Sequence, residues 1–290
     1  MSAPFALALH GGAGPIRNTD QSREMANMGA LLDEGRVMLS KGAASVEVVV
    51  AMIRGLEEAG YYIAGKGAAP NRDGKYELDA SIMDGQKRRA GAVCALSGFR
   101  SPIAAARAVM DKTPHVLLAG AGAAKFCAEA GLEPVNDPQS YYTPAARSQA
   151  STDALSHGTV GCVALDRAGA LCAGTSTGGV LNKMPGRVGD APLIGAGTWA
   201  DERVAISCTG QGEYFIRAAV AADVSARMKY AGMSVDAAAA GALVDMERQG
   251  GDGGLIAVDA AGRIALPFIS HGMRRAACDS AGNVTVMVFR

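Results

Sequence analysis

The stretch on which the fold depends reads Ser156-His157-Gly158-Thr159-Val160-Gly161-Cys162-Val163-Ala164-Leu165-Asp166. It places a threonine directly after a glycine, at the head of an apolar strand. A threonine hydroxyl needs a base within reach, and its own α-amine can serve once the preceding peptide bond is cut. Gly158 permits the strained backbone that would help Thr159 to attack the carbonyl before it. The pattern therefore predicts self-cleavage between Gly158 and Thr159. The alternative is that Thr159 is an ordinary strand residue, because threonine is common in strands.

The segment before this stretch has a different composition. Residues 133–157 are rich in Asn, Asp, Pro, Gln, Ser and Tyr and have no hydrophobic period. Such a composition predicts a mobile connection, and a long one inside a compact protein is often functional or processed. It ends just before Thr159, where a processing site would need freedom of the chain.

The segment after Thr159 predicts two similar hairpins. Strand runs at 160–165 and 170–176 are joined by Asp166-Arg167-Ala168-Gly169, and runs at 255–258 and 263–266 are joined by Asp259-Ala260-Ala261-Gly262. A glycine in each turn is typical of an antiparallel hairpin. The first hairpin would bring the hydroxyls of Thr175-Ser176-Thr177 beside Thr159.

The remaining elements alternate between strands and helices. Strands are predicted at 5–10 (closed by a turn at Gly11-Gly12-Ala13-Gly14), 90–96 and 284–289. Helices are predicted around 25–37, from a Ser45 cap to Gly60, after Ser101-Pro102, at 214–230, and at 235–248 after a Ser234 cap. This mixed order predicts an α+β fold with largely antiparallel sheets between layers of helices.

Bulk composition excludes several classes of protein. The chain has 290 residues, 49% of them hydrophobic and 19% charged, so it can form one large core or two small ones. Lys+Arg and Asp+Glu both number 28, which indicates no nucleic-acid or membrane partner. No signal peptide or membrane-spanning run is expected. Six scattered cysteines and four histidines lack the spacing of disulfide or zinc sites, which fits a reducing cytoplasm.

Two further segments carry groups that could bind an amino acid. Arg187-Val188-Gly189-Asp190 sets a cation close to an anion, and a guanidinium is a bidentate partner for a carboxylate. Thr209-Gly210-Gln211-Gly212 ends a strand and offers backbone N–H groups to an oxyanion. Taken singly, a surface ion pair and tight turns explain these segments better than a binding role does.

Together with His10-Gly11-Gly12-Ala13-Gly14 and Glu77-Leu78-Asp79-Ala80-Ser81-Ile82-Met83-Asp84-Gly85, these segments resemble the plant-type asparaginase/isoaspartyl peptidase family. That family is the threonine branch of the N-terminal nucleophile (Ntn) hydrolases, and the resemblance covers nearly the whole chain. It implies a four-layer αββα sandwich formed by a single domain, 1–290. It also implies processing into an α subunit (1–158) and a β subunit (159–290), paired as (αβ)2. Glycine before the threonine, where glycosylasparaginases have aspartate, favours the isoaspartyl peptidase branch.

The resemblance also implies a role for each site residue. Thr159 would be the nucleophile, supported by Thr177, with Thr209 and Gly210 as the oxyanion hole. Arg187 would bind the substrate carboxylate, and Asp190 with Gly212 its ammonium, Gly210 also lying against the substrate. The expected reaction is hydrolysis of β-aspartyl dipeptides, with L-asparaginase activity, through an acyl-enzyme on Thr159. No cofactor is expected for catalysis.

A structural sodium ion is a further implication of the resemblance. The family binds it with backbone carbonyls of a loop, here those of Leu56, Glu57, Ala59, Tyr62, Ala64 and Lys66. The chain departs from the family at Ile63, where an asparagine is usual, and Asn71 is a candidate to supply the missing hydrogen bond. It also departs at Ser270-His271-Gly272-Met273-Arg274-Arg275, where we expect a solvated basic turn rather than an effect of Arg274 or Arg275 on dipeptide preference.

Three rival hypotheses remain. The run from His115 to Lys125 looks like the glycine-rich entry to a dinucleotide-binding fold. Lys125 occupies the position that needs glycine or alanine, however, and no acidic strand end follows about 20 residues later. A relative that binds amino acids without being processed, and an enzyme that is primarily an L-asparaginase, both stay open.

Overall fold

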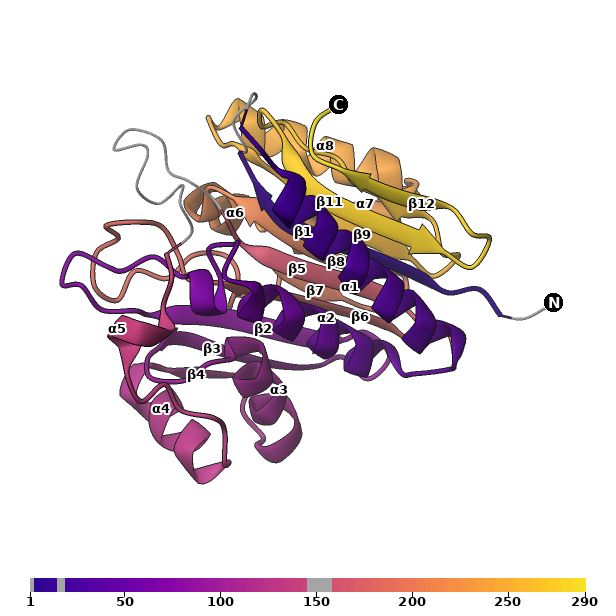
Figure 1. Ribbon diagram of the computed structural model, residues 1–290. Helices are drawn as coiled ribbons and strands as arrows, with labels where there is room; N and C mark the ends of the chain where they lie inside the picture. Colours follow the sequence, from indigo (N-terminus) through magenta and orange to yellow (C-terminus); the bar gives the residue numbers. More distant parts are fainter. Residues whose placement is uncertain (1–2, 15–18, 145–157) are drawn as a thin grey trace.

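The computed structural model describes residues 3–14, 19–144 and 158–290. These residues form two β-sheets (Figure 1). The larger sheet has the spatial order β12-β11-β1-β5-β6-β2-β3-β4, antiparallel except between β3 and β4. Its strands are β1 (Ala6–Ala13), β2 (Leu78–Asp84), β3 (Arg89–Leu96), β4 (Leu117–Ala119), β5 (Val160–Leu165), β6 (Leu171–Thr177), β11 (Met273–Asp279) and β12 (Val284–Met287). The smaller, antiparallel sheet has the order β10-β9-β8-β7. Its strands are β7 (Thr198–Ala200), β8 (Val204–Gly210), β9 (Gly253–Asp259) and β10 (Ile264–Ala265).

The two sheets pack against each other through an apolar cluster. Ala8, Val163 and Ala173 come from the larger sheet, and Ile256 and Val258 from the smaller one. Because successive strand residues point to opposite faces, the other face of each sheet is left for helices.

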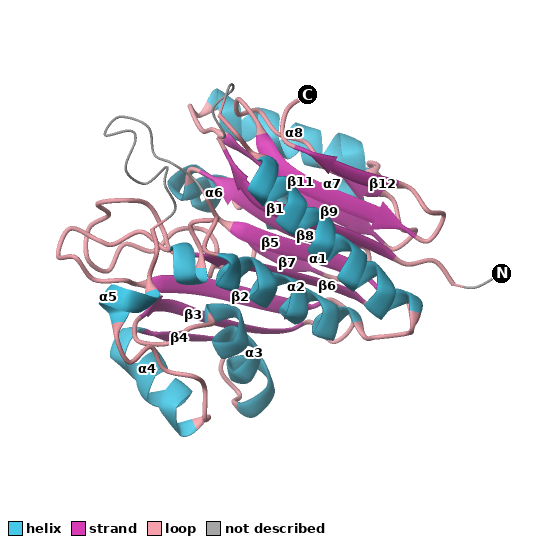
Figure 2. Cartoon of the chain, viewed as in Figure 1, coloured by secondary structure: helices cyan, strands magenta, loops and turns pink. Residues whose placement is uncertain are grey.

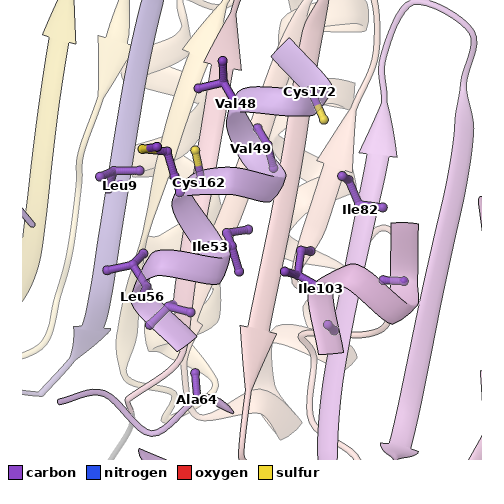
Figure 3. Close-up of a cluster of buried hydrophobic side chains, with 14 of the residues drawn as sticks. Leu9, Val48, Val49, Ile53, Leu56, Ala64, Ile82, Ile103, Cys162 and Cys172 are labelled. Carbon is purple, nitrogen blue, oxygen red and sulfur yellow. The ribbon is translucent and has the colours of Figure 1, made fainter. Parts of the chain in front are cut away.

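Helices cover the outer face of the larger sheet (Figure 2). α1 (Ser22–Ser40) lies over β1 and β11, α2 (Ser45–Ala59) over β5 and β6, and α3 (Pro102–Lys112) over β2 and β3. Figure 3 shows Val49 and Ile53 of α2 packed near Cys162 of β5 and Ile103 of α3. α4 (Gly120–Glu129) lies beside β3, and η1 (Gly65–Gly67) is a short 3-10 turn after α2.

The smaller sheet carries its own helical layer. α7 (Val220–Ala231) and α8 (Val235–Arg248) bury apolar faces against β8 and β9, preceded by the short α6 (Gly212–Ala218). The predicted mixed α+β class is confirmed. The predicted hairpins are confirmed as β5–β6 and β9–β10.

The start and end of α2 show how distant residues define a helix. Gly60 ends it in the left-handed conformation (φ 71°), as predicted. Ser45 is not the cap, which is Ala44; instead the backbone N–H of Ser45 donates to Asp166 Oδ2 at 2.8 Å. The turn of the β5–β6 hairpin therefore satisfies the N-terminus of α2. Ser101 and Ser234 do cap α3 and α8.

Two further predictions about local structure are wrong. The helix expected at 214–230 is broken at Ala219, whose φ is 47°. The break lets the N–H groups of Ala221 and Ala222 donate to the carbonyls of Ala196 and Gly195, at 3.2 and 2.9 Å. The turn expected after His10 is also absent: β1 continues to Ala13, with an irregular register between His10 and Ala13.

The connection predicted at 133–157 is described only in part. Its first half contains α5 (Pro138–Tyr141), which Asp137 caps by accepting from Gln139 N at 3.0 Å, and residues 145–157 lie outside the described residues. All six cysteines are buried and unpaired; five lie in strands, and Cys127 lies in α4. Within the described ranges, no helix is long and apolar enough to cross a membrane.

Candidate active site

The hydroxyls of Thr159 and Thr177 meet at one end of the larger sheet. Val160 of β5 pairs with Ser176 of β6, and this register sets Thr159 opposite Thr177, the last residue of β6. Thr159 Oγ donates to Thr177 Oγ at 3.2 Å, and both residues are buried. The predicted placement of a β6 hydroxyl beside Thr159 is confirmed.

Backbone groups fix the direction in which Thr177 hydrogen-bonds. Its hydroxyl donates to the carbonyl of Ile63 at 3.4 Å and accepts from the N–H of Gly179 at 3.1 Å. The same Ile63 carbonyl accepts from Gly178 N at 2.8 Å. Since its hydrogen points to Ile63, Thr177 offers an oxygen lone pair to Thr159, which holds the hydroxyl of Thr159 in one orientation.

Gly158 lies against Ile63. A Cβ built on Gly158 would be 2.5 Å from Cγ1 of Ile63 and 2.7 Å from its backbone nitrogen, closer than real contacts allow. Only glycine fits there without a shift of the backbone. Asn71 does not supply a substitute amide: it donates to Glu77 at 3.0 Å, and its oxygen accepts from the N–H groups of Asp73 and Lys75.

Thr209 and Gly210 are the last two residues of β8, a strand of the smaller sheet. The hydroxyl oxygen of Thr209 accepts from Ala13 N at 3.1 Å, which leaves its hydrogen to donate. Gly210 has a φ of 153°, and a Cβ there would lie 2.4 Å from the carbonyl of Asp252. Thr209 is thereby attached to the end of β1, whose His10 pairs with Gly161 of β5, two residues after Thr159.

Arg187 and Asp190 converge on the start of α6. Arg187 forms a bidentate ion pair with Glu213 through Nε and Nη2, both at 2.9 Å. Gly212 allows the close approach of Asp190, because a Cβ on Gly212 would lie 2.9 Å from Asp190 Oδ1. Glu213 was not predicted as a site residue, although it directly follows the Thr209–Gly212 motif.

Asp190 is a buried carboxylate with an unused oxygen. Burial raises the pKa of Asp190 to about 7, although nearby Arg187 opposes the shift. Its Oδ2 atom has no hydrogen-bond partner among the described residues. An unpaired buried carboxylate is costly, so this oxygen is suited to a cationic ligand.

Asp79 and Lys183 form a second group of buried charged side chains near Arg187. Burial raises the pKa of Asp79 and lowers that of Lys183, and each charge partly offsets the shift of the other. Lys183 Nζ donates to the carbonyl of Glu77 at 2.6 Å, and the Glu77 carboxylate accepts from Gly186 N at 3.0 Å. These contacts hold the loop that carries Arg187. The sequence analysis did not single out Lys183.

His10 is a further residue that the sequence analysis did not assign. Its imidazole is completely buried, and Nδ1 donates to the carbonyl of Thr159 at 3.1 Å. Burial lowers the pKa of His10 to about 3, which keeps the ring neutral. The only signal in the sequence was its position before Gly11-Gly12.

The C-terminal segment 270–275 does not form the solvated basic turn that we expected. Arg274 is buried and donates to Gln21 and to the carbonyl of Gly11, at 2.8 and 3.2 Å. Arg275 is buried as well and donates to the carbonyls of Met273 and Val288. Both guanidiniums are occupied by backbone and side-chain acceptors, which argues against a role in selecting the leaving group.

Comparisons with known proteins identify the family of the chain. A family model described as asparaginase matches residues 3–288. The isoaspartyl peptidases of Salmonella typhimurium and Escherichia coli are each 43% identical to the chain, over 98% of its length and 98% and 96% of their own. A plant-type L-asparaginase of Pyrobaculum calidifontis is 38% identical over 93% of this chain and 95% of its own. The chain belongs to the plant-type asparaginase family and is a hydrolase of the isoaspartyl peptidase/L-asparaginase kind.

Proposed function

We propose that the chain cleaves itself between Gly158 and Thr159 and then acts as an isoaspartyl peptidase with L-asparaginase activity. The observation that carries this proposal is the contact of 3.2 Å between the hydroxyls of Thr159 and Thr177. It orients the hydroxyl of a threonine that follows a glycine with no room for a side chain. The two packed sheets with helices on both outer faces fit the αββα sandwich of Ntn hydrolases.

Self-cleavage would begin with attack of Thr159 Oγ on the carbonyl carbon of Gly158. The C–N bond breaks as a C–O ester bond forms, and the hydroxyl proton ends on the departing nitrogen. Water then hydrolyses the ester, which leaves a carboxylate on Gly158 and a free α-amine and hydroxyl on Thr159. The products are an α subunit, 1–158, and a β subunit, 159–290.

The free α-amine would then serve as the base for the same hydroxyl. Thr159 Oγ attacks the β-carbonyl of an aspartyl group, and Thr209 with Gly210 stabilises the oxyanion. The leaving group is an amino acid from a β-aspartyl dipeptide or ammonia from asparagine, and it takes the proton from the amine. Water releases aspartate and regenerates the hydroxyl of Thr159.

The clamp for the aspartyl group would consist of Arg187 and Asp190. The guanidinium takes the substrate α-carboxylate and Asp190 Oδ2 takes the α-ammonium, aided by the close approach of Gly212 and Gly210. A substrate carboxylate must share Arg187 with Glu213, because that ion pair is already bidentate. This arrangement recognises the amino-acid end of the substrate and leaves the leaving group to the opposite side.

Kinetics on three substrates test the proposed activity. We expect kcat/KM for a β-aspartyl dipeptide to exceed that for L-asparagine, with no hydrolysis of the matching α-aspartyl dipeptide. A higher kcat/KM for asparagine would support the second candidate, an enzyme that is primarily an L-asparaginase. Absence of hydrolysis of all three by soluble, folded protein would support the unprocessed amino-acid-binding relative instead.

A structural sodium ion is the one metal that the resemblance implies. The last carbonyls of a helix have no partner within it and carry partial negative charge, which suits Leu56, Glu57 and Ala59 at the end of α2. The loop then folds so tightly that a Cβ on Gly67 would lie 2.1 Å from the carbonyl of Tyr62. These hard oxygen donors fit a monovalent cation, with the carbonyls of Tyr62, Ala64 and Lys66 completing the set.

Melting curves in chloride salts test this site. We expect the melting temperature to be higher in sodium than in choline chloride at equal ionic strength, because bound ligand stabilises the folded state. Equal values would contradict a bound sodium ion. The Glu57 carboxylate is not part of the site: Ser101, Ser176 and the N–H of Ile103 already donate to it.

Two further features remain predictions. The pairing of processed chains as (αβ)2 follows from the resemblance and is testable by light scattering. The cytoplasmic location rests on the cysteine content of the sequence and is testable by cell fractionation.

A further inference from the structure

Five polar side chains form a continuous line in the layer between the two sheets. They come from five different strands, β1, β2, β6, β7 and β8, and each is completely buried: His10, Ser81, Thr175, Thr198 and Ser207. One end of the line contacts the carbonyl of Thr159, and the other contacts the carbonyl of Ala191, the neighbour of Asp190.

Every step of this line is within hydrogen-bonding distance. His10 Nδ1 lies 3.1 Å from Thr159 O, and His10 Nε2 lies 2.9 Å from Ser207 Oγ. Ser207 Oγ is 2.7 Å from Thr175 Oγ1, which is 2.5 Å from Thr198 Oγ1. Thr198 Oγ1 is 2.8 Å from Ser81 Oγ, and Ser81 Oγ is 2.6 Å from Ala191 O.

The surrounding strands leave space for this line. Gly161 of β5 faces it, and a Cβ there would lie 2.0 Å from Ser207 Oγ and 2.2 Å from His10 Nε2. Apolar side chains also pack in the layer between the two sheets, and side chains of this kind could fill the layer without any polar group. Burying polar groups is costly unless each finds a partner, so the line does not serve packing alone.

The hydrogens available to the line are fewer than its contacts. A carbonyl only accepts, so His10 Nδ1 must donate to Thr159, and the neutral ring then accepts at Nε2 from Ser207. Ala191 O at the far end is also an acceptor, within reach of both Ser81 and Thr198, and Thr175 lies 3.1 Å from the carbonyl of Gly197. One imidazole hydrogen and four hydroxyl hydrogens must therefore serve eight contacts. The orientation of each hydroxyl depends on its neighbours, which couples the two ends of the line.

We propose that this line of five side chains is a positioning device that holds the carbonyl of Thr159 and the backbone beside Asp190 in a fixed relation. The proposal rests on the proposed function, since it assigns Thr159 to the chemistry and Asp190 to the substrate ammonium. None of the five side chains need touch the substrate. They act through the backbone of Thr159 and of Ala191, the neighbour of Asp190, and so are positioning residues.

Thr198 is the best place to break the line. Its loss leaves two shorter lines: His10, Ser207 and Thr175 on the Thr159 side, and Ser81 on Ala191. Four hydrogens then serve the five contacts that remain, so the shortage of hydrogens falls from three to one. Thr198→Val keeps the shape of the side chain and removes only the hydroxyl, so the variant should fold while the ends are uncoupled.

The test compares Thr198→Val with Thr198→Ser, which restores the hydroxyl. We expect Thr198→Val to lower kcat on a β-aspartyl dipeptide about 3- to 10-fold, the value of a lost hydrogen bond. Its melting temperature should stay within about 2 °C of the wild type, because 1 kcal/mol shifts a chain of this size by a few degrees. Thr198→Ser should recover kcat to within twofold. Ser225→Ala, which removes a buried hydroxyl bonded to Asp201 away from the line, is the matched control and should keep kcat.

A double-mutant cycle checks that the line acts as a unit. Ser81 and Ser207 do not contact each other, yet the losses in kcat from Ser81→Ala and Ser207→Ala should combine to less than their product. Multiplicative losses, a wild-type kcat and KM in Thr198→Val, or a Thr198→Ser as impaired as Thr198→Val would each overturn the proposal. If Thr198→Val does not fold, the cycle alone decides. An uncut, inactive wild-type protein would instead refute the proposed function.

Discussion

Thr159 Oγ lies 3.2 Å from Thr177 Oγ, at the open end of the β5–β6 hairpin. The hairpin register fixes this relationship, because Val160 and Ser176 are paired one step before it. The position of the nucleophile therefore depends on a sheet buried on both faces and not on the segment that precedes Gly158. A rigid strand pair is a better support for a nucleophile than a loop.

Removing the Thr177 hydroxyl should impair catalysis with little change in binding. Thr177→Val deletes the oxygen that accepts from Thr159 and from Gly179 N, and a buried donor left unpaired costs about 1–3 kcal/mol. We predict a fall in kcat of about 10- to 100-fold, with KM changed less than threefold. Thr177→Ser keeps the oxygen and should retain most of the activity. A Thr177→Val enzyme within twofold of wild-type kcat would show that the contact does not matter.

Removing the Arg187 guanidinium should affect substrate binding and spare self-cleavage. A bidentate charged contact with the substrate carboxylate is worth about 1.5–3 kcal/mol, so Arg187→Ala should raise KM about 10- to 100-fold. Arg187→Lys keeps the charge but loses the bidentate geometry, so its KM should lie between those of the wild type and Arg187→Ala. The extent of cleavage at Gly158–Thr159 is measured on the same samples by gel electrophoresis. Equal loss of cleavage and of binding would make Arg187 a structural residue, held to Glu213.

Substrate binding should weaken at acidic pH because of Asp190. Burial raises the pKa of this carboxyl to about 7, so it is neutral below that pH in the free enzyme. An ammonium ligand needs the ionised form, and binding must then expel a proton. We predict that the Kd of L-aspartate is nearly constant above pH 7.5 and rises about tenfold per pH unit below 6.5. Calorimetry in two buffers measures both the Kd and the released proton. A flat profile from pH 5.5 to 8 would contradict the assignment.

The raised pKa of Asp190 also affects stability. Its effect on the free energy of unfolding has the opposite sign to that of an acid whose pKa is lowered by folding. A raised folded-state pKa means that the native state holds a proton which the unfolded state has released. The contribution of Asp190 to the free energy of unfolding therefore declines as pH rises from about 4 to about 7. Asp190→Asn should remove this component from the pH dependence of urea unfolding.

A side chain at position 158 should slow self-cleavage. In Gly158→Ala the new methyl group would lie 2.5–2.7 Å from Ile63, so the scissile peptide or the Ile63 segment must move. We predict a cleavage half-time at least tenfold longer than in the wild type. The extent of cleavage is measured over time by denaturing gel electrophoresis at a fixed temperature. Ile63→Ala in the same chain removes the contact with Cγ1 but keeps those with Cβ and the backbone nitrogen, at 2.6 and 2.7 Å, and should restore only part of the rate. Wild-type cleavage in Gly158→Ala would mean that the contact is not kept during the reaction.

Local signals in the sequence were enough to predict the elements that bear the site. The β5–β6 hairpin follows from an apolar run, a glycine turn and a second apolar run, and each of these is visible within 20 residues. The chain segments of Thr159, Thr177, Arg187 and Asp190 were likewise found from residue type and spacing. Their convergence was inferred from the resemblance, because no local pattern encodes which strand ends share an edge.

Long-range contacts account for what the sequence did not show. The break at Ala219 lies among good helix formers, and it exists because carbonyls of Gly195 and Ala196 take the N–H groups that would continue the helix. The N–H of Ser45 at the start of α2 donates to Asp166, 121 residues away. The line from His10 to Ser81 joins five strands, and each of its residues alone looks like an ordinary strand residue.

Intact mass spectrometry under denaturing conditions tests the central claim most directly. The wild-type protein is incubated at neutral pH and compared with Thr159→Ala prepared in the same way. Cleavage between Gly158 and Thr159 predicts two chains, 1–158 and 159–290, in the wild type and one uncut chain in Thr159→Ala. A wild-type chain that stays intact, or a Thr159→Ala chain that still splits at this bond, would contradict the account.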